Sequence, residues 1–150
     1  QLAWSIMKNF KDKLILPKDV AVFDTSNPKE TGTIRDRYDI RPTEKICDIG
    51  PKAILEYAKI LKTAKTICWN GPLGYFEKKP FRTGTMSLAR IVGSVSSGQA
   101  FGVAGGGETV AAIRQSHQFE YIDHVSTGGG AMLEYLAGTK LPGIEALVKK

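Results

Sequence analysis

The stretch Ala104-Gly105-Gly106-Gly107-Glu108-Thr109-Val110-Ala111-Ala112 decides the fold of this chain. An apolar run enters it from residue 100 and a helix-forming run leaves it, which indicates a strand followed by a helix. Because glycine has no Cβ, three glycines at this junction let a ligand approach the backbone closely. The free N–H groups at the start of a helix attract anions, phosphate above all. The stretch therefore predicts a phosphate site, although a lone triplet is more often only a turn.

A second triplet, Gly128-Gly129-Gly130, follows another predicted strand over residues 121–126. Two further breaks, at residues 48–51 and 70–72, also come directly after predicted strands. In open parallel sheets, ligands bind beyond the carboxyl ends of the strands. We therefore expect these four segments to converge on one edge of a sheet.

Strands and helices alternate along the remaining sequence. The predicted strands cover residues 20–23, 45–49, 66–69, 100–104 and 121–126. The predicted helices cover residues 1–10, 51–63, 86–95, 131–136 and 144–148, with one more running from the first triplet to residue 114. Residues 24–35 are polar and predict a surface loop or hairpin. This order predicts an α/β fold, a three-layer α/β/α Rossmann-like domain with a mostly parallel sheet.

Composition bounds the class of protein. The chain has 150 residues, of which 42% are hydrophobic and 24% charged, which suits one folded domain rather than a disordered segment. The net charge of +6 is spread along the sequence, so it indicates either an ordinary solvated surface or help in drawing polyanionic ligands. No basic tract is interleaved with aromatics, and no apolar run could span a bilayer. We expect neither nucleic acid nor a membrane as a partner.

The two cysteines, Cys47 and Cys68, both lie in apolar runs that predict buried strands. For residues 66–69 the run is nearly continuous, as in strands buried on both faces. This pattern favours reduced core thiols and a cytoplasmic protein over a disulfide framework. The sequence starts without Met, lacks a signal-peptide pattern and opens within a predicted helix. We expect it to be a piece of a longer chain.

Few side chains are candidates for chemistry. Glu108 could hold Mg²⁺ beside bound phosphates, or could simply be a first-turn glutamate that the helix dipole stabilises. Thr109 could donate its hydroxyl to a phosphate or cap the helix. Glu77 could accept hydrogen bonds from both ribose hydroxyls, or could be a solvated loop residue. His117 and His124 lie far from either cysteine in sequence, so a metal centre or a cysteine–histidine nucleophile is poorly supported.

Longer motifs then narrow the choice, because the chain resembles the C-terminal part of the phosphoglycerate kinase family over essentially its whole length. The segments that carry the resemblance are Asp48-Ile49-Gly50-Pro51-Lys52, Trp69-Asn70-Gly71-Pro72-Leu73-Gly74-Tyr75-Phe76-Glu77, Phe81-Arg82-Thr83-Gly84-Thr85, Gly105-Gly106-Gly107-Glu108-Thr109, His124-Val125-Ser126-Thr127-Gly128-Gly129-Gly130-Ala131 and Leu141-Pro142-Gly143.

The resemblance implies a monomeric, two-domain, hinge-closing glycolytic kinase. Such a kinase transfers a phosphoryl group reversibly between 1,3-bisphosphoglycerate and ADP, giving 3-phosphoglycerate and ATP, with Mg²⁺. Residues 1–150 would be a truncated C-terminal nucleotide-binding domain, with the N-terminal substrate domain absent. The isolated chain is then expected to be inactive, because transfer needs both substrates held in place.

The resemblance also implies residue roles. The adenosine side would comprise Gly71, Leu73 and Phe76, with Glu77 on the ribose hydroxyls. The phosphate side would comprise Gly106, Gly107 and Thr109, with Glu108 at the metal. A helix N-terminus aimed at the transferred phosphoryl, the catalytic element, would comprise Gly128, Gly129 and Gly130.

One residue departs from the family pattern. Glu108 stands where the family usually has Asp, so its carboxylate reaches one methylene further out. Direct metal ligation is therefore open, and contact through a water is the alternative. Two other classes of function stay open as well: a non-catalytic nucleotide-binding or regulatory module on the same fold, and an oligomerisation module. The second would leave both triplets unexplained.

Overall fold

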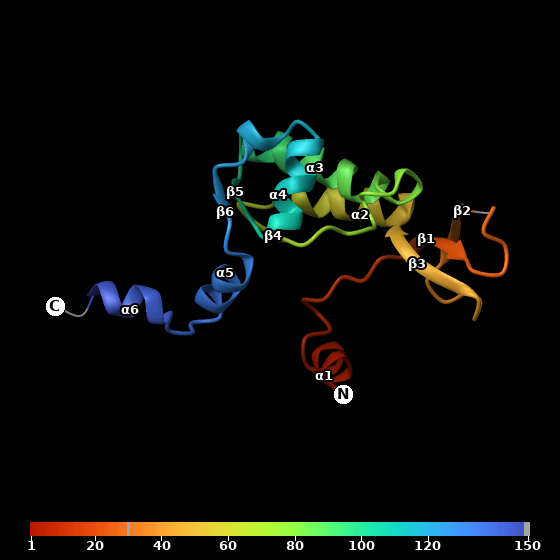
Figure 1. The fold of residues 1–150 in the computed structure, drawn as a ribbon, viewed down its shortest axis with the longest axis horizontal. Helices are drawn as coiled ribbons and strands as arrows, with labels where there is room; N and C mark the ends of the chain where they lie inside the picture. The colour runs from red at the N-terminus through yellow and green to blue at the C-terminus, as the bar shows by residue number, and fades with distance from the viewer. Residues whose placement is uncertain (30, 149–150) are drawn as a thin grey trace.

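The computed structural model of the protein describes residues 1–29 and 31–148. The described strands are β1 (Asp19–Asp24), β2 (Thr31–Asp36), β3 (Glu44–Ile49), β4 (Thr66–Asn70), β5 (Phe101–Gly105) and β6 (His124–Ser126). The α-helices are α1 (Leu2–Asn9), α2 (Pro51–Leu61), α3 (Thr83–Ser96), α4 (Gly107–Gln115), α5 (Gly129–Leu136) and α6 (Pro142–Val148) (Figure 1). The predicted α/β fold class is confirmed, with most boundaries within a few residues.

The first three strands form a sheet of their own, in the order β2-β1-β3. Both pairings are antiparallel, with Ala21 opposite Ile34 and Val22 opposite Ile46. The predicted loop or hairpin over residues 24–35 is a hairpin, since β1 and β2 pair across it. A connection this short can join only antiparallel neighbours. The sequence prediction did not separate these strands from the parallel sheet.

A largely buried ion pair links β2 to β3 in this first sheet. The Arg35 guanidinium donates to Glu44 Oε1 through Nε at 2.9 Å and Nη2 at 2.8 Å. The Arg41 N–H donates to Glu44 Oε2 at 2.9 Å. These hydrogen bonds, with the largest effect coming from Arg35, hold the pKa of Glu44 below its ordinary value of 4.5.

Glu44→Gln should therefore change how stability depends on pH. A carboxyl whose pKa is lowered by folding contributes stability that is present above its ordinary pKa and is lost as pH falls through the folded value. We expect the variant to be less stable than the native chain at neutral pH, and the difference to shrink as pH falls below 4.5. Urea denaturation at several pH values measures this. The exposed Glu120→Gln is the control, and a difference that does not vary with pH would contradict the assignment.

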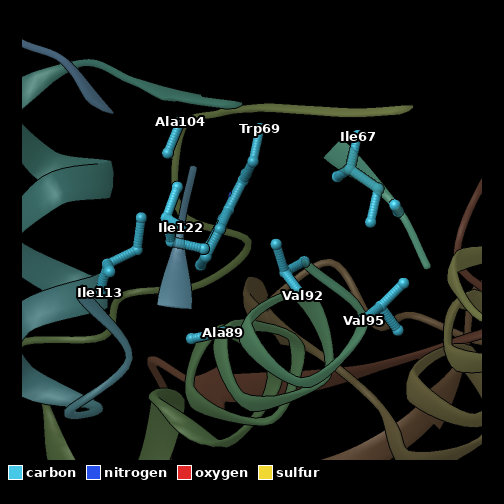
Figure 2. Packing of buried hydrophobic residues seen from close by; sticks show 9 residues of the cluster. Ile67, Trp69, Ala89, Val92, Val95, Ala104, Ile113 and Ile122 are labelled. Carbon is cyan, nitrogen blue, oxygen red and sulfur yellow. The ribbon is translucent and has the colours of Figure 1, made fainter. Parts of the chain in front are cut away.

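The second sheet, β4-β5-β6, is parallel throughout. Helix α3 connects β4 to β5, and α4 connects β5 to β6. One face of the sheet and these two helices enclose the main core, whose members are Ile67, Trp69, Ala89, Val92, Val95, Ala100, Ala104, Ile113 and Ile122. Figure 2 shows the Trp69 indole reaching from β4 into the middle of this cluster. Helix α3 also contacts β3, so it joins the two sheets.

The other face of the parallel sheet is largely open, which corrects one prediction. Along β4 the side chains alternate, with Ile67 and Trp69 buried and Thr66, Cys68 and Asn70 exposed. The expectation that both faces of this strand, and hence Cys68, are buried is wrong for the described chain, because a cavity separates this face from α5 and Leu141. Cys47 is half-buried, and both thiols are free.

Three helices at the ends of the chain contribute no buried residue: α1, α5 and α6. Figure 1 shows α1 and α6 standing apart from the two sheets. Within residues 1–29 and 31–148, no helix is both long and apolar enough to cross a membrane.

Candidate functional site at the strand ends

The carboxyl ends of the three parallel strands are tied together by hydrogen bonds. Asn70, which ends β4, donates from Nδ2 to the Gly129 carbonyl at 3.4 Å. The Gly106 N–H, directly after β5, donates to the Ser126 carbonyl of β6 at 3.2 Å. The predicted convergence of residues 70–72 and both glycine triplets is therefore confirmed.

The two triplets meet backbone to backbone, which explains why glycine is required. A Cβ added at Gly129 would lie 2.7 Å from the Cα of Gly106 and 2.9 Å from its nitrogen. Gly106 itself has φ +95, a conformation that side chains rarely adopt. A larger residue at Gly129 would force the two strand ends apart, and one at Gly106 would strain the backbone, although a Cβ there would meet nothing closer than 3.7 Å.

Two helix N-termini begin at this meeting point. Helix α4 starts at Gly107 after Gly106, and α5 starts at Gly129 after Gly128. Neither helix has a side-chain cap on its first N–H groups. Each helix start carries a partial positive charge, so the junction of the triplets attracts anions. Gly107, Glu108, Gly128 and Gly130 are exposed there.

The loop after β4 forms the second side of the site. Leu73 is half-buried and Glu77 is exposed, so both are accessible. The Phe76 ring is only 5% exposed and packs in a small cluster with Met86 and Ala112. Phe76 thus supports the loop from within, and little of its ring remains for a ligand.

The fourth predicted segment, residues 48–51, reaches a different part of the site. Asp48, near the end of β3, lies beside the loop after β4. Its Oδ2 accepts the Gly84 N–H at 2.8 Å, and the Tyr75 N–H donates to the neighbouring Cys47 carbonyl at 2.8 Å. A Cβ at Gly74 would lie 2.3 Å from Asp48 Oδ1. Burial of this 2%-exposed carboxyl raises its pKa. Residues 48–51 therefore brace the loop rather than joining the triplets, because β3 belongs to the antiparallel sheet.

Three polar residues of this region are not among the site residues that the sequence predicts: Asp48, Asn70 and Thr85. Each joins segments distant in sequence, as with Asn70 and Gly129. Thr85 is fully buried, and its Oγ1 accepts the N–H groups of Leu73 at 3.0 Å and Gly74 at 3.1 Å. The sequence feature that could have indicated these residues is that each is polar and lies in a motif at the end of a strand or the start of a helix.

A cavity of about 420 Å³ adjoins the second triplet. It lies between the open sheet face and α5, and its lining includes Cys68, His124, Gly128 and Met132. Among the described residues there is no group of three or more His, Cys, Asp or Glu side chains that could hold a metal ion. A metal at the triplets would therefore depend on oxygen atoms of a ligand in addition to the Glu108 carboxylate.

Known proteins are similar to this chain over nearly its whole length. The sequence model of the family described as "Phosphoglycerate kinase" matches residues 1–139. A phosphoglycerate kinase of Lactiplantibacillus plantarum is 42% identical over 155 residues, covering 100% of this chain and 37% of the relative. One of Borrelia garinii subsp. bavariensis is 46% identical over 152 residues, covering 99% of this chain and 38% of the relative.

Solved structures show the same likeness. The phosphoglycerate kinase of Coxiella burnetii matches with a TM-score of 0.80 and 36% identity, over 97% of this chain and 37% of that structure. The enzyme of Pyrococcus horikoshii matches with a TM-score of 0.79 and 34% identity, over 97% of this chain and 35% of that structure. The chain thus spans a little over one third of the length of these relatives, and it belongs to the phosphoglycerate kinase family.

Proposed function

We propose that this chain is the nucleotide-binding part of a cytoplasmic phosphoglycerate kinase that interconverts 1,3-bisphosphoglycerate and ADP with 3-phosphoglycerate and ATP. The observation that carries the proposal is the meeting of two uncapped helix N-termini across Gly106 and Gly129. Two partial positive charges at one point suit a polyphosphate. The 3-phosphoglycerate would be bound by a part of the enzyme outside these residues.

Each segment of the site then has a role. Gly71 and Leu73 border the adenosine, with Phe76 packed behind them, and Glu77 accepts hydrogen bonds from the ribose hydroxyls. The Gly107 N–H binds the nucleotide phosphates, and Gly106, whose own N–H donates to the Ser126 carbonyl, lets them approach the backbone closely. The helix that begins with Gly128, Gly129 and Gly130 stabilises charge on the phosphoryl group during transfer. Such transfer depends chiefly on positioning and electrostatic stabilisation.

Mg²⁺ fits the donor set of this site. Mg²⁺ typically takes one or two carboxylates together with substrate phosphates, and the exposed Glu108 offers one carboxylate in the first turn of α4. When bound with the nucleotide, the ion neutralises phosphate charge. Glu108 would hold it directly or through a water.

Glu108→Gln should weaken the response to Mg²⁺. Removing the carboxylate charge while keeping the side-chain length is expected to raise the Mg²⁺ concentration for half-maximal activity by roughly tenfold, the scale of one lost charge-assisted contact. A Mg²⁺ titration of a full-length enzyme carrying these residues measures this, and Glu108→Asp should keep the response. An unchanged requirement in Glu108→Gln would argue against a metal-side role.

A coupled assay with ATP and 3-phosphoglycerate tests the proposed function itself. A full-length enzyme that contains these residues should turn over, and the 150-residue chain alone should not, because catalysis requires both substrates to be positioned. Turnover by the isolated chain would contradict the proposal that it is no more than the nucleotide-binding part. A full-length protein that binds nucleotide without turnover would favour a regulatory module.

A further inference from the structure

We propose that Thr109 and Thr85 are positioning residues: their buried hydroxyl oxygens hold the turn Gly71–Gly74 against α4 and α3, and so fix the nucleoside side of the site relative to its phosphate side. The inference rests on the proposed function, because it concerns how the same site aligns a nucleotide. It differs from the expectation that the Thr109 hydroxyl either donates to a phosphate or caps α4.

Thr109 faces the loop after β4. It is 1% exposed, and its Oγ1 accepts the Gly71 N–H at 2.7 Å. The side chain makes no capping hydrogen bond to its own helix. With so little of its surface open, the hydroxyl serves the protein backbone first. Because Thr109 follows Glu108 in the first turn of α4, this hydrogen bond ties the loop to the phosphate side.

Thr85 holds the other end of the same turn. It is 0% exposed in the first turn of α3, and its single hydroxyl oxygen accepts the N–H groups of both Leu73 and Gly74. The oxygen thereby uses both of its acceptor sites on the loop. Thr85 is thus bonded to the loop from α3, and its effect on a nucleotide has to pass through that loop.

The turn that Thr109 and Thr85 hold is also fixed at the Gly71 carbonyl. Trp69 Nε1 donates to the Gly71 carbonyl at 2.7 Å, so the N–H and the C=O of Gly71 are both held by side chains. Gly71 has φ +95. A glycine without such partners has wide conformational freedom. The hydrogen bonds therefore select one path for the chain that leads to Leu73 and Glu77.

The consequence is a fixed spacing between two sets of ligand groups. Leu73 and Glu77 lie on the loop, and Gly107 and Glu108 lie at the start of α4. Small misplacements of positioned groups cost binding and rate even when the groups themselves remain. Loss of either threonine hydroxyl should therefore weaken nucleotide binding without removing any group that touches the nucleotide.

Thr109→Val and Thr85→Val test this in a full-length enzyme carrying these residues. Valine keeps the shape and removes the acceptor, and we expect the KM for ADP to rise about three- to tenfold, the scale of one lost hydrogen bond. The KM for 1,3-bisphosphoglycerate should not change. Thr109→Ser and Thr85→Ser keep the hydroxyl and should restore the native KM. Thr83→Val, at an exposed position of the same helix as Thr85, is the matched control.

Hydrogen exchange of the loop amides separates positioning from direct contact. In Thr109→Val the Gly71 N–H should exchange about three- to tenfold faster, and in Thr85→Val those of Leu73 and Gly74 should do so. A raised KM with unchanged Gly71 exchange would make Thr109 a phosphate ligand and overturn the proposal. Faster exchange with an unchanged KM would reduce both residues to structural ones and overturn it too. If a valine variant does not fold, the alanine variant carries the same expectations.

Failure of the proposed function has a different signature. In that case the unsubstituted full-length enzyme would neither turn over nor bind MgADP, whatever residue occupies position 85 or 109. An active native enzyme whose valine variants keep the native KM for ADP would contradict only the positioning role.

Discussion

Replacing Gly129 by alanine is expected to push the two glycine triplets apart and to lower the free energy of unfolding by about 1–3 kcal/mol, the usual cost of overpacking. The new Cβ would lie 2.7 Å from the Cα of Gly106, so backbone rather than a flexible side chain would have to shift. MgADP binding should fall in parallel, because the helix N-termini of α4 and α5 no longer meet. Urea denaturation and calorimetry measure the two effects.

Gly130→Ala is the matched control for stability. It lies one residue further along α5, and a Cβ there meets nothing within 4 Å. Alanine also favours a helix by up to about 1 kcal/mol over glycine. We therefore expect Gly130→Ala to keep or raise the free energy of unfolding. Equal losses in the two variants would mean that the close approach of Gly106 and Gly129 is not what glycine provides here.

Trp69→Ala should give the largest loss of stability, about 3–5 kcal/mol, as for other buried aromatic side chains truncated to alanine. The indole is 9% exposed and fills the middle of the core between the parallel sheet and α3 (Figure 2). Its Nε1 also holds the Gly71 carbonyl. The core and the nucleoside loop thus depend on the same side chain.

Two further variants separate these contributions. Trp69→Phe keeps most of the apolar contact but removes the donor, so it should cost less stability than alanine while still freeing Gly71. Trp4→Ala, at a 76%-exposed tryptophan in α1, should change the free energy of unfolding by less than about 0.5 kcal/mol. A loss at position 69 no larger than at position 4 would contradict the assignment of Trp69 to the core. Urea denaturation followed by circular dichroism measures all three.

The features that the sequence predicts correctly depend on local chemistry. The order of strands and helices follows from apolar periodicity and from breakers such as Gly50-Pro51, which ends β3 and starts α2. The convergence of both triplets with Asn70 follows from a general property of parallel sheets. These inferences needed no knowledge of what each strand packs against.

Burial of individual strands could not be predicted in the same way. The apolar run of β4 predicts cover on both faces, yet Cys68 is exposed, because a cavity separates that side from α5. Whether a second layer covers a strand depends on segments elsewhere, not on the strand. The same holds for β1 to β3, since their separation from β4 to β6 is decided by which strands pair.

The side chains that hold the site in place could not be predicted from the sequence either. Asp48, Thr85 and Thr109 each lie within a quoted motif, but their partners lie 36, 12 and 38 residues away. A polar side chain in a motif indicates function in general and does not say whether it contacts a ligand or a backbone amide. Only the folded geometry distinguishes these cases.

We expect a nucleotide to bind where the two triplets meet the loop after β4. A titration of the isotope-labelled chain with MgADP, followed by amide chemical shifts, tests it most directly because weak binding still moves the signals of contacted groups. We expect the amides of Gly71, Gly106, Gly107 and Gly129 to shift together along one binding curve, while those of α1 stay in place. Shifts confined to other regions, or none at these glycines at millimolar MgADP, would contradict the account.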